Sequence, residues 1–296
     1  MEKFFNLIAN PSSKNGVASL EKAKAVLDMK NIQYNDFLCK SPEEAREIAA
    51  RVSQEGGNLV AIGGDGTFNN VINGIKDFAK TKLGFIIGGT GNDFAETFKI
   101  NKDPAQAMCD ILENNVGTID LLDVNGRKCL NVTSTGLDIE VLRTYNKMKL
   151  FKGKIKYLLS LLITLMRFGS YHTVFKIDGQ EYERNALIIA GGNGQCYGGG
   201  MKVTPHADLT DGKISVTVVN KVPKIKYPIV LPKFIKGKHE KLKKYIEQFV
   251  CEEFEVSLPD EAVPTLEVDG EVLENAIFKC KILPNLLNVF MPTIKA

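Results

Sequence analysis

The first 120 residues alternate two hydrophobic patterns. Short, largely apolar runs of the kind found in buried parallel strands occur at residues 4–9, 59–62 and 82–87, with a further strand expected at residues 33–39. Between the first three expected strands, residues 19–30 and 41–54 place apolar side chains at helical spacing. Ser41 as N-cap and Pro42 at the first helical position mark a helix start. The pattern predicts a parallel sheet covered by helices.

Beyond Asp120 the pattern changes to short β-rich runs separated by turns. The expected strands span residues 129–142, 171–190, 212–220, 252–258, 264–269 and 275–283. An amphipathic helix at about residues 153–168 and a basic connection at residues 221–248 interrupt them. Residues 287–291 are expected to form a strand that returns to the first part of the chain. We therefore predict two domains, residues 1–121 with 286–296, and residues 122–285 in an antiparallel β arrangement.

Length and composition agree with two globular domains, and the apolar runs and cysteines indicate the cellular compartment. The chain has 296 residues, of which 44% are hydrophobic and 25% charged, and this length exceeds one comfortable core. The longest apolar run, residues 157–166, is about half a membrane span, and the N-terminal run is too short for a signal peptide. Six cysteines without a CxxC pair favour reduced thiols over disulfides or zinc. We expect a cytoplasmic protein that is at most peripheral to the inner face of the membrane.

The net charge of +3 conceals two basic segments. Residues 143–156 carry six Lys and Arg side chains and no acid, and residues 221–244 carry nine lysines against Glu240. Such clusters suit an anionic membrane, although a solvated face that aids solubility explains either cluster alone. We expect no binding to nucleic acid, and the sequence does not decide between a monomer and a homodimer.

Residues 58–74 combine a buried strand, a glycine-rich turn and a helix start. The strand stops at GGDG, residues 63–66, and Thr67, a candidate N-cap, precedes helical spacing. Backbone N–H groups and the positive helix end meet there with no Cβ in the way, which suits phosphate. Asp65 would repel phosphate unless a cation lay between them, so the motif indicates Mg²⁺ on a nucleotide. The alternative is a tight turn in which Asp65 accepts hydrogen bonds from local amides.

A second turn of the same kind follows at residues 88–95, GGTGNDFA, and it also carries an acid, Asp93. Two such turns on successive parallel strands are expected to form opposite walls of one crevice at the carboxyl ends of the strands, where open α/β sheets bind ligands. Residues 10–16, NPSSKNG, add hydroxyls, amides and the cation of Lys14, which together suit a phosphate tail.

Two acidic turns in the second half are further candidates. Asp208 and Asp211 lie three residues apart in a tight turn that suits one hard cation, the alternative being a simple Asp-Gly hairpin turn. Asp269 and Glu271 flank Gly270, and such a pair can serve as a general base and its orienting partner, the alternative being a solvated turn. The three histidines show no spacing typical of a metal cluster or a catalytic triad.

Taken together and in order, these motifs resemble the diacylglycerol kinase catalytic family. The resemblance rests on residues 10–13, 63–67, 89–95, 198–200, 208–212 and 268–271, and it covers nearly the whole chain. It is strongest to the soluble bacterial lipid kinases, which are similar to sphingosine kinases. GGDGT also occurs in NAD kinases, whereas GTGNDFA points to the lipid branch. The resemblance implies a Rossmann-like three-layer α/β domain that holds ATP, an antiparallel β-sandwich that holds lipid, and an active site in the cleft between them.

The resemblance also implies which residues contact ATP. These are Asn10, Pro11, Ser12, Ser13, Lys14, Gly64, Asp65, Gly66, Thr67, Phe68, Asn69, Asn70 and Thr90. Cys39 stands where an ATP-contacting Thr is common in the family, and Asn70 stands where Glu is usual. The contacts to the nucleotide are therefore expected to differ in detail at these two positions.

Metal ions and the base follow from the same resemblance. Asp65 and Asp93 would organise a catalytic Mg²⁺ through water. A structural Mg²⁺ would be held by Asp208, Asp211 and the carbonyl of Lys213. Glu271 would be the general base, with Asp269 as the second candidate.

The implied reaction transfers the γ-phosphate of ATP to the hydroxyl of a diacylglycerol-like lipid at the membrane surface, with Mg²⁺, and gives phosphatidic acid. One alternative is another acceptor, such as a sphingoid base or NAD. The other is a nucleotide- or lipid-binding protein without activity, and the joint presence of Asp65, Asp93 and Glu271 argues against it.

Overall fold

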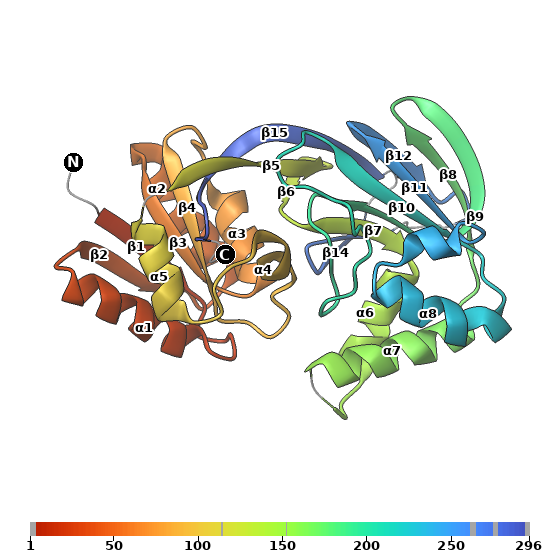
Figure 1. Cartoon of the computed structure of the whole chain (residues 1–296), viewed down its shortest axis with the longest axis horizontal. Helices are drawn as coiled ribbons and strands as arrows, with labels where there is room; N and C mark the ends of the chain where they lie inside the picture. The colour runs from red at the N-terminus through yellow and green to blue at the C-terminus, as the bar shows by residue number, and fades with distance from the viewer. Residues whose placement is uncertain (1–3, 114, 152, 261–264, 275–277, 294–296) are drawn as a thin grey trace. The chain divides into compact units, whose positions relative to one another are not determined.

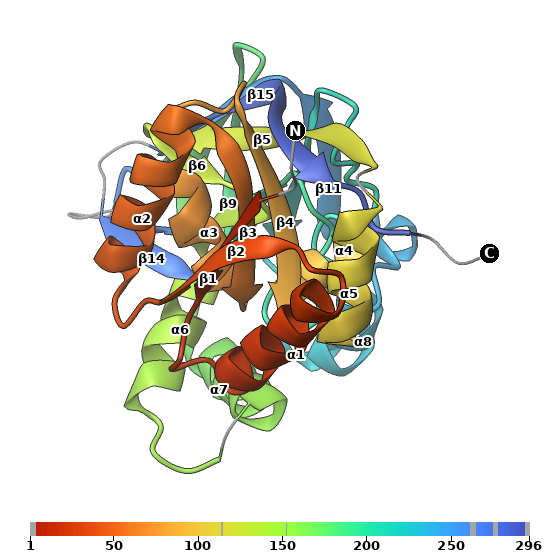
Figure 2. The same cartoon turned by 90° about the vertical axis from the view of Figure 1, so that its left-hand side faces the viewer.

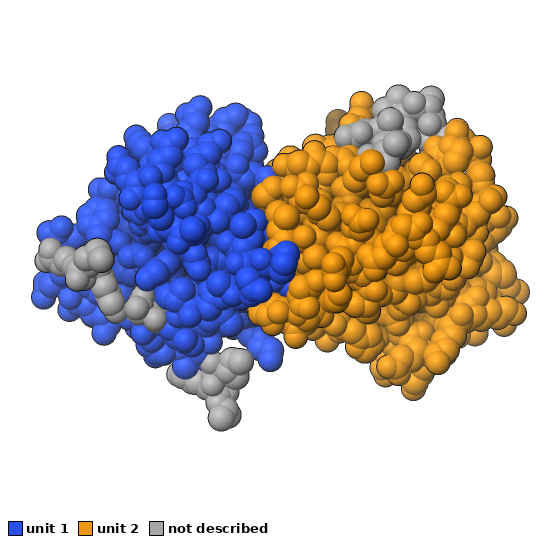
Figure 3. All heavy atoms as spheres, turned by 90° about the horizontal axis from the view of Figure 1, so that it is seen from above, with its two compact units in different colours: residues 1–121, 284–296 blue, residues 122–283 orange. Residues whose placement is uncertain are grey.

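The structure is a computed structural model that describes residues 4–113, 115–151, 153–260, 265–274 and 278–293. The chain divides into two compact units, which Figure 3 colours separately: unit 1 is residues 1–121 with 284–296, and unit 2 is residues 122–283. Within the described residues, no helix is long and apolar enough to cross a membrane.

Unit 1 is a three-layer α/β arrangement (Figures 1 and 2). Its parallel strands β1 (Phe4–Ala9), β2 (Gln33–Leu38), β3 (Gly57–Gly63) and β4 (Thr81–Ile87) lie in the order β4-β3-β1-β2. Its helices are α1 (Gly16–Met29), α2 (Pro42–Glu55), α3 (Asp65–Gly74), α4 (Asp93–Phe98) and α5 (Pro104–Leu112). Helix α1 packs against α5 and α2 packs against α3, and Figure 2 shows the two pairs on opposite sides of the sheet.

The local sequence explains these elements. Residues 59–62 of β3 are completely buried, as a central parallel strand requires. Helix α2 begins as predicted, because the Ser41 side chain accepts a hydrogen bond from the N–H of Glu44 at 3.2 Å and Pro42 occupies the first turn. It ends at Glu55, and the next residue is Gly56, whose φ of 77° favours glycine. The parallel sheet and its helices, predicted from the hydrophobic pattern, are confirmed.

The end of the chain also belongs to unit 1. Strand β15 (Phe278–Phe290) runs beyond the boundary at residue 284, and its Val289 pairs in parallel with Leu83 of β4. Strand β5 (Val116–Val124) pairs with β15. The structure therefore contains the returning strand that residues 287–291 predict.

Unit 2 is an antiparallel β-sandwich (Figure 1). Its strands are β6 (Arg127–Cys129), β7 (Val132–Gly136), β8 (Tyr171–Ile177), β9 (Gln180–Gly192), β10 (Ile214–Asn220), β11 (Ile246–Cys251), β12 (Glu253–Ser257), β13 (Thr265–Val268) and β14 (Glu271–Glu274). The long strand β9 serves both layers, because its first half pairs with β8 and its second half pairs with β7 and β10. Apolar side chains from β5, β8, β10, β12 and β15 fill the space between the layers. Pro264 and residues 275–277 of the expected strands lie outside the described residues.

Helices cover one outer face of the sandwich. They are α6 (Leu137–Lys147), α7 (Gly153–Arg167) and α8 (Tyr227–Ile235), the last preceded by the 3₁₀ turn η1 (Lys224–Lys226), and they form a second apolar core with the sheet. Only α7 is as predicted. Residues 137–142, expected as strand, are helical, because Leu137 and Val141 face the core one turn apart although the local apolar pattern alternates. Helix α8 was not predicted, because Pro228 and Pro232 argue against a helix in this segment. The expected connection at residues 221–248 also contains the start of β11.

Candidate functional site

A pocket of about 410 Å³ opens at the carboxyl ends of the first three strands of unit 1. Its walls are the β1–α1 loop, the β2–α2 connection and the first turn of α3. The polar and glycine residues that line it are Asn10, Ser12, Ser13, Lys40, Ser41, Gly64, Gly66, Thr67 and Asn70, and Cys39 and Pro42 also contribute. This is the edge of the sheet at which α/β proteins bind nucleotides.

Helix α3 begins at Asp65, so the predicted N-cap at Thr67 is wrong. Gly64 is the N-cap, and the N–H of Thr67 donates to the carbonyl of Gly64 at 2.9 Å. Gly64, in extended backbone conformation, is the single residue between β3 and α3. The first turn of α3 therefore lies at the pocket wall, where Gly66 and Thr67 line it.

Asp65 connects the two glycine-rich turns. Its carboxylate accepts hydrogen bonds from the N–H of Asp93 at 3.1 Å and from the N–H of Phe94 at 2.9 Å, at the start of α4. The first N–H groups of a helix have no partner inside it, so Asp65 stabilises this helix start. Asp65 thus makes the local amide contacts that the sequence offered as an alternative. Each carboxylate oxygen keeps a second lone pair, which can accept a further hydrogen bond.

The second turn packs directly against the first. A Cβ on Gly89 would lie 2.5 Å from Cα of Gly64, so only glycine fits at this contact. The second turn does not line the pocket described above, so the expectation that the two turns form opposite walls of one crevice stays a prediction. Residues 39–42 provide the other wall of that pocket, and the second turn packs against the first through Gly64 and Gly89.

The residues expected to contact ATP fall into two groups. Asn10, Ser12, Ser13, Cys39, Gly64, Gly66, Thr67 and Asn70 line the pocket, whereas Pro11, Lys14, Asp65, Phe68, Asn69 and Thr90 do not. The Phe68 ring is fully buried and contacts Phe85 edge-on, with ring centroids 5.0 Å apart. The roles of all these residues stay predictions. Lys40, Ser41 and Pro42 were missed, although the strong helix start after β2 places them at the same edge of the sheet.

The two positions that depart from the family pattern have specific surroundings. Cys39 is buried, and burial, with a smaller effect of Glu44, raises the pKa of its thiol to about 11, so the thiol is neutral at physiological pH. The Asn70 side chain donates to the carbonyl of Gly66 at 2.7 Å and accepts from Arg46. Asn70 therefore ties α3 to α2 beside the pocket.

In unit 2, the candidate base Glu271 forms an ion pair. Nη2 of Arg127 on β6 donates to Oε2 of Glu271 at 2.7 Å. The Glu271 side chain is 37% exposed and that of Arg127 only 20%, so the guanidinium is the more firmly held partner. A carboxylate held in this way has a fixed direction and keeps access to solvent.

Asp269, the second candidate, has a different position. Its carboxylate accepts hydrogen bonds from the N–H groups of Leu130 at 2.7 Å, Asn131 at 2.9 Å and Val132 at 3.2 Å. It therefore holds the connection between β6 and β7 next to the turn that carries Glu271. Asp269 is thus engaged with backbone N–H groups, whereas the Glu271 side chain is partly exposed, and the roles of both stay predictions.

Two more acids are buried behind this turn. The hydroxyl of Ser134 lies between the carboxyl groups of Asp138 and Glu267, and Glu267 also accepts from the N–H of Gly270. Burial raises the pKa of Asp138 to about 6 and raises that of Glu267 well above its usual range. One hydroxyl proton serves only one acceptor, so a proton on Glu267 completes the chain of hydrogen bonds. The sequence did not indicate this cluster, because an acid in a strand normally faces water.

The turn at residues 208–213 was expected to hold a structural Mg²⁺. Asp208 accepts from the N–H of Thr210, and Asp211 accepts from the N–H of Lys213, both at 2.9 Å. Carboxylate and carbonyl oxygens are the donors that Mg²⁺ prefers, so the donor set fits. Among the described residues, no cluster of three or more His, Cys, Asp or Glu side chains could hold a metal. A cation here would therefore use carbonyls and water besides the two acids.

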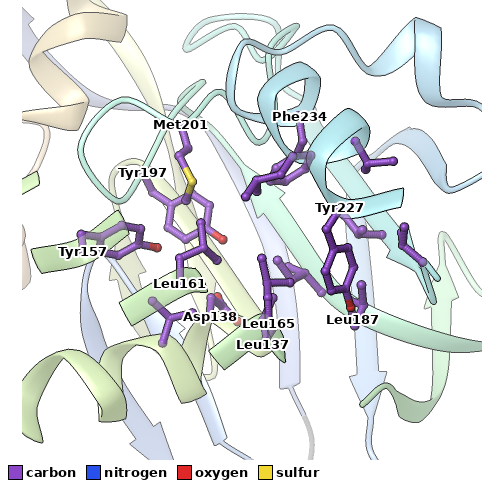
Figure 4. A pocket seen from close by; sticks show the side chains of 16 residues that line it. Leu137, Asp138, Tyr157, Leu161, Leu165, Leu187, Tyr197, Met201, Tyr227 and Phe234 are labelled. Atoms are coloured by element: carbon purple, nitrogen blue, oxygen red, sulfur yellow. The ribbon is translucent and has the colours of Figure 1, made fainter. Parts of the chain in front are cut away.

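An apolar pocket lies between the sheet of unit 2 and its helices (Figure 4). It is lined by α6, α7 and α8 together with β9 and β10, and most of its side chains are Leu, Val, Ile, Phe and Met. The polar atoms at its wall come from Tyr157, Tyr197, Tyr227 and Asp138. Oδ1 of Asp138 is buried, and in the described part of the chain it has no hydrogen-bond partner.

Comparison with known proteins supports the resemblance seen in the motifs. Residues 5–124 match the family model of the diacylglycerol kinase catalytic domain, and residues 131–291 match that of the YegS C-terminal NAD kinase beta sandwich-like domain. A diacylglycerol kinase from Mycobacterium tuberculosis is 30% identical over 245 residues, 79% of each chain. One from Staphylococcus carnosus is 27% identical over 276 residues, 92% of this chain and 89% of the relative.

A solved structure gives the same fold. A candidate diacylglycerol kinase from Bacillus anthracis superposes with a TM-score of 0.82 at 23% identity, covering 99% of this chain and 97% of the other. The match to the catalytic-domain model and the relatives named diacylglycerol kinase place the chain among the lipid kinases. Within that class, the chain belongs to the diacylglycerol kinase family, which confirms the family and the fold class predicted from the sequence.

Proposed function

We propose that this protein transfers the γ-phosphate of ATP to the hydroxyl of a diacylglycerol-like lipid and so forms phosphatidic acid. The observation that carries the proposal is the pocket in unit 1, whose wall is a glycine turn and helix start held in place by Asp65. Phosphoryl transfer needs a positioned phosphate and little covalent chemistry from the protein, and such a turn provides that positioning.

Each part of the reaction has a candidate group in this chain. The loop at residues 10–14 and the first turn of α3 would bind the phosphates. Mg²⁺ bound with ATP would neutralise charge on the transferred phosphate. Asp65, whose carboxylate keeps lone pairs for a cation-bound water, would contribute to holding this ion. Glu271, held in direction by Arg127, would take the proton of the acceptor hydroxyl.

The apolar pocket of unit 2 supports a lipid acceptor. Its lining is almost entirely hydrocarbon, which suits an acyl chain and offers few partners to a polar acceptor such as NAD. The lining residue Asp138 has a buried Oδ1 atom without a hydrogen-bond partner among the described residues. The cavity measures about 40 Å³, so a long acyl chain would require its side chains to move apart. We also propose that the protein works in the cytoplasm, at the inner face of the membrane.

The test is transfer of label from γ-phosphate-labelled ATP to separate acceptors: diacylglycerol, sphingosine, phosphatidylglycerol and NAD. We expect labelled phosphatidic acid, formed only when Mg²⁺ is present. Label in sphingosine or NAD and not in diacylglycerol would contradict the proposed acceptor. No transfer to any acceptor would contradict the kinase activity itself.

A further inference from the structure

The outer face of α7 carries an uninterrupted apolar stripe. The side chains at residues 155, 158, 162 and 166 follow at intervals of three or four residues and so share one side of the helix, with exposed fractions of 63%, 45%, 44% and 63%. The other side, with Leu161 and Leu165, lines the apolar pocket. A surface helix normally presents polar side chains opposite its core face, so this second apolar side requires a partner.

Neighbouring segments extend the stripe. Leu150 and Phe151, just before α7, are 74% and 57% exposed, and Ile225 and Ile229 of η1 and α8 are 84% and 54% exposed. Nζ of Lys224 donates to the carbonyl of Met166 at 2.6 Å, which places η1 beside the end of α7. We call these eight residues the α7–η1 face: Leu150, Phe151, Ile155, Leu158, Leu162, Met166, Ile225 and Ile229.

The segments that carry this face are rich in basic side chains, one of which, Arg143, pairs with Glu140 just before the first segment. Residues 141–168 and 221–239 contain no Asp or Glu. Their basic side chains among the described residues are Arg143, Lys147, Lys149, Lys156, Arg167, Lys221, Lys224, Lys226, Lys233, Lys236 and Lys238. Lys152 of the basic segment, and the side chain of Lys154, lie outside the described residues. Apolar side chains surrounded by lysines match the interface of an anionic bilayer, with hydrocarbon below and phosphate at the rim.

We propose that the α7–η1 face docks on an anionic lipid bilayer, with α7 lying in the plane of the interface. The proposal rests on the proposed function, in which the apolar pocket takes a lipid. Helix α7 lies between that pocket and the docked face. A lipid that leaves the bilayer would then reach the pocket by passing a single helix. The partner is a lipid surface and not one individual lipid molecule.

The test is flotation of the full chain with vesicles of phosphatidylcholine alone or mixed with phosphatidylglycerol. We expect binding to the anionic vesicles that weakens with salt, and a loss of roughly tenfold or more in partitioning for Leu158→Asp and for Leu162→Asp. Neither residue lines the pocket, and both are exposed. Met29→Asp is the matched control, because Met29 is 76% exposed on α1 of unit 1, and it should bind as the wild type does.

Several results would overturn the docking surface. These are no binding of the wild type to anionic vesicles, equal binding to both vesicle types, or unchanged binding of both aspartate variants. Light scattering that shows a dimer broken by Leu162→Asp, with vesicle binding unchanged, would instead make the face a contact between two copies.

A second assay separates this proposal from the proposed function. Turnover of a short-chain diacylglycerol dissolved as monomers needs no membrane, so Leu162→Asp should keep it and lose activity only on vesicles. If the wild type phosphorylates no lipid at all, the function fails, whereas the flotation result still decides whether the face binds a bilayer.

Discussion

The guanidinium of Arg127 donates a hydrogen bond to the carboxylate of Glu271, with 2.7 Å between Nη2 and Oε2. The two residues lie 144 positions apart in the sequence, on β6 and β14 of unit 2. A partly exposed ion pair adds little to the free energy of unfolding, so its value lies in the direction it gives to the carboxylate.

Arg127→Ala should therefore lower kcat by roughly tenfold or more and change the KM for ATP by only a few-fold. Steady-state kinetics with diacylglycerol in mixed micelles measure both constants. Arg127→Lys should restore part of kcat, and Lys128→Ala is the matched control, since the neighbouring Lys128 pairs with Asp123 instead. Unchanged kcat in Arg127→Ala would show that the pair has no part in catalysis.

Asp65→Ala should affect both turnover and stability. The substitution leaves the N–H groups of Asp93 and Phe94 without their acceptor, which should cost about 0.5–2 kcal/mol and lower the melting temperature. Turnover should fall by orders of magnitude, because the phosphate turn also loses its link to a cation. Glu96→Ala, which removes an exposed acid of α4, the helix whose first N–H groups donate to Asp65, should change neither quantity much. Full activity with the same Mg²⁺ requirement would reduce Asp65 to a turn residue.

Asp211→Ala tests the proposed structural cation at residues 208–213. A ligand that binds only the folded state raises the melting temperature by mass action. The wild type should melt at higher temperature as Mg²⁺ is added, and Asp211→Ala should lose that increase. Asp260→Ala, an acid with a 74% exposed side chain elsewhere in unit 2, should keep it. A Mg²⁺ response that survives in Asp211→Ala would remove the cation from this turn.

The buried acid Asp138 predicts a pH dependence with a definite sign. Burial raises its pKa from the usual 3.8 to about 6, so the folded protein holds this proton more tightly than the unfolded chain does. The resulting stabilisation is complete below about pH 4 and is lost as the pH rises through 6, by at most about 3 kcal/mol. Asp138→Asn has no titrating carboxyl at this position, so it should not lose this stabilisation as the pH rises. Its melting temperature should rise relative to that of the wild type between about pH 4 and pH 7, and parallel curves would contradict the shift.

The sequence predicted those parts of the fold that follow from local patterns. The buried strands of unit 1, the capped start of α2 and the glycine turns are each specified by a few adjacent residues. Helix α6 was not predicted, because Leu137, Ile139 and Val141 alternate with polar residues as in a strand. Only the packing of this segment against neighbouring helices favours a helix over a strand. Helix α8 contains Pro232, and burial of Val230 and Phe234 outweighs its low propensity.

The site was predictable in its motifs and less so in its contacts. Asp65 and Glu271 were predicted as site residues from their motifs, and the hydrogen-bond partners that the structure gives them were not predicted. Phe94 and Arg127 lie 29 and 144 residues away from them, and no local pattern reports such contacts. The Asp138 and Glu267 cluster was unpredictable for the same reason, since burial of an acid depends on the whole core around it.

The most direct test of the account is the steady-state turnover of Glu271→Gln with ATP and diacylglycerol. The glutamine keeps the shape of the side chain and cannot accept the proton, so turnover should fall roughly 100- to 10,000-fold while ATP affinity stays within a few-fold. Glu274→Gln, the exposed acid at the other end of β14, should retain normal turnover. A Glu271→Gln enzyme with normal turnover would contradict the assignment of the base, and one that loses ATP affinity would make Glu271 a nucleotide-binding residue.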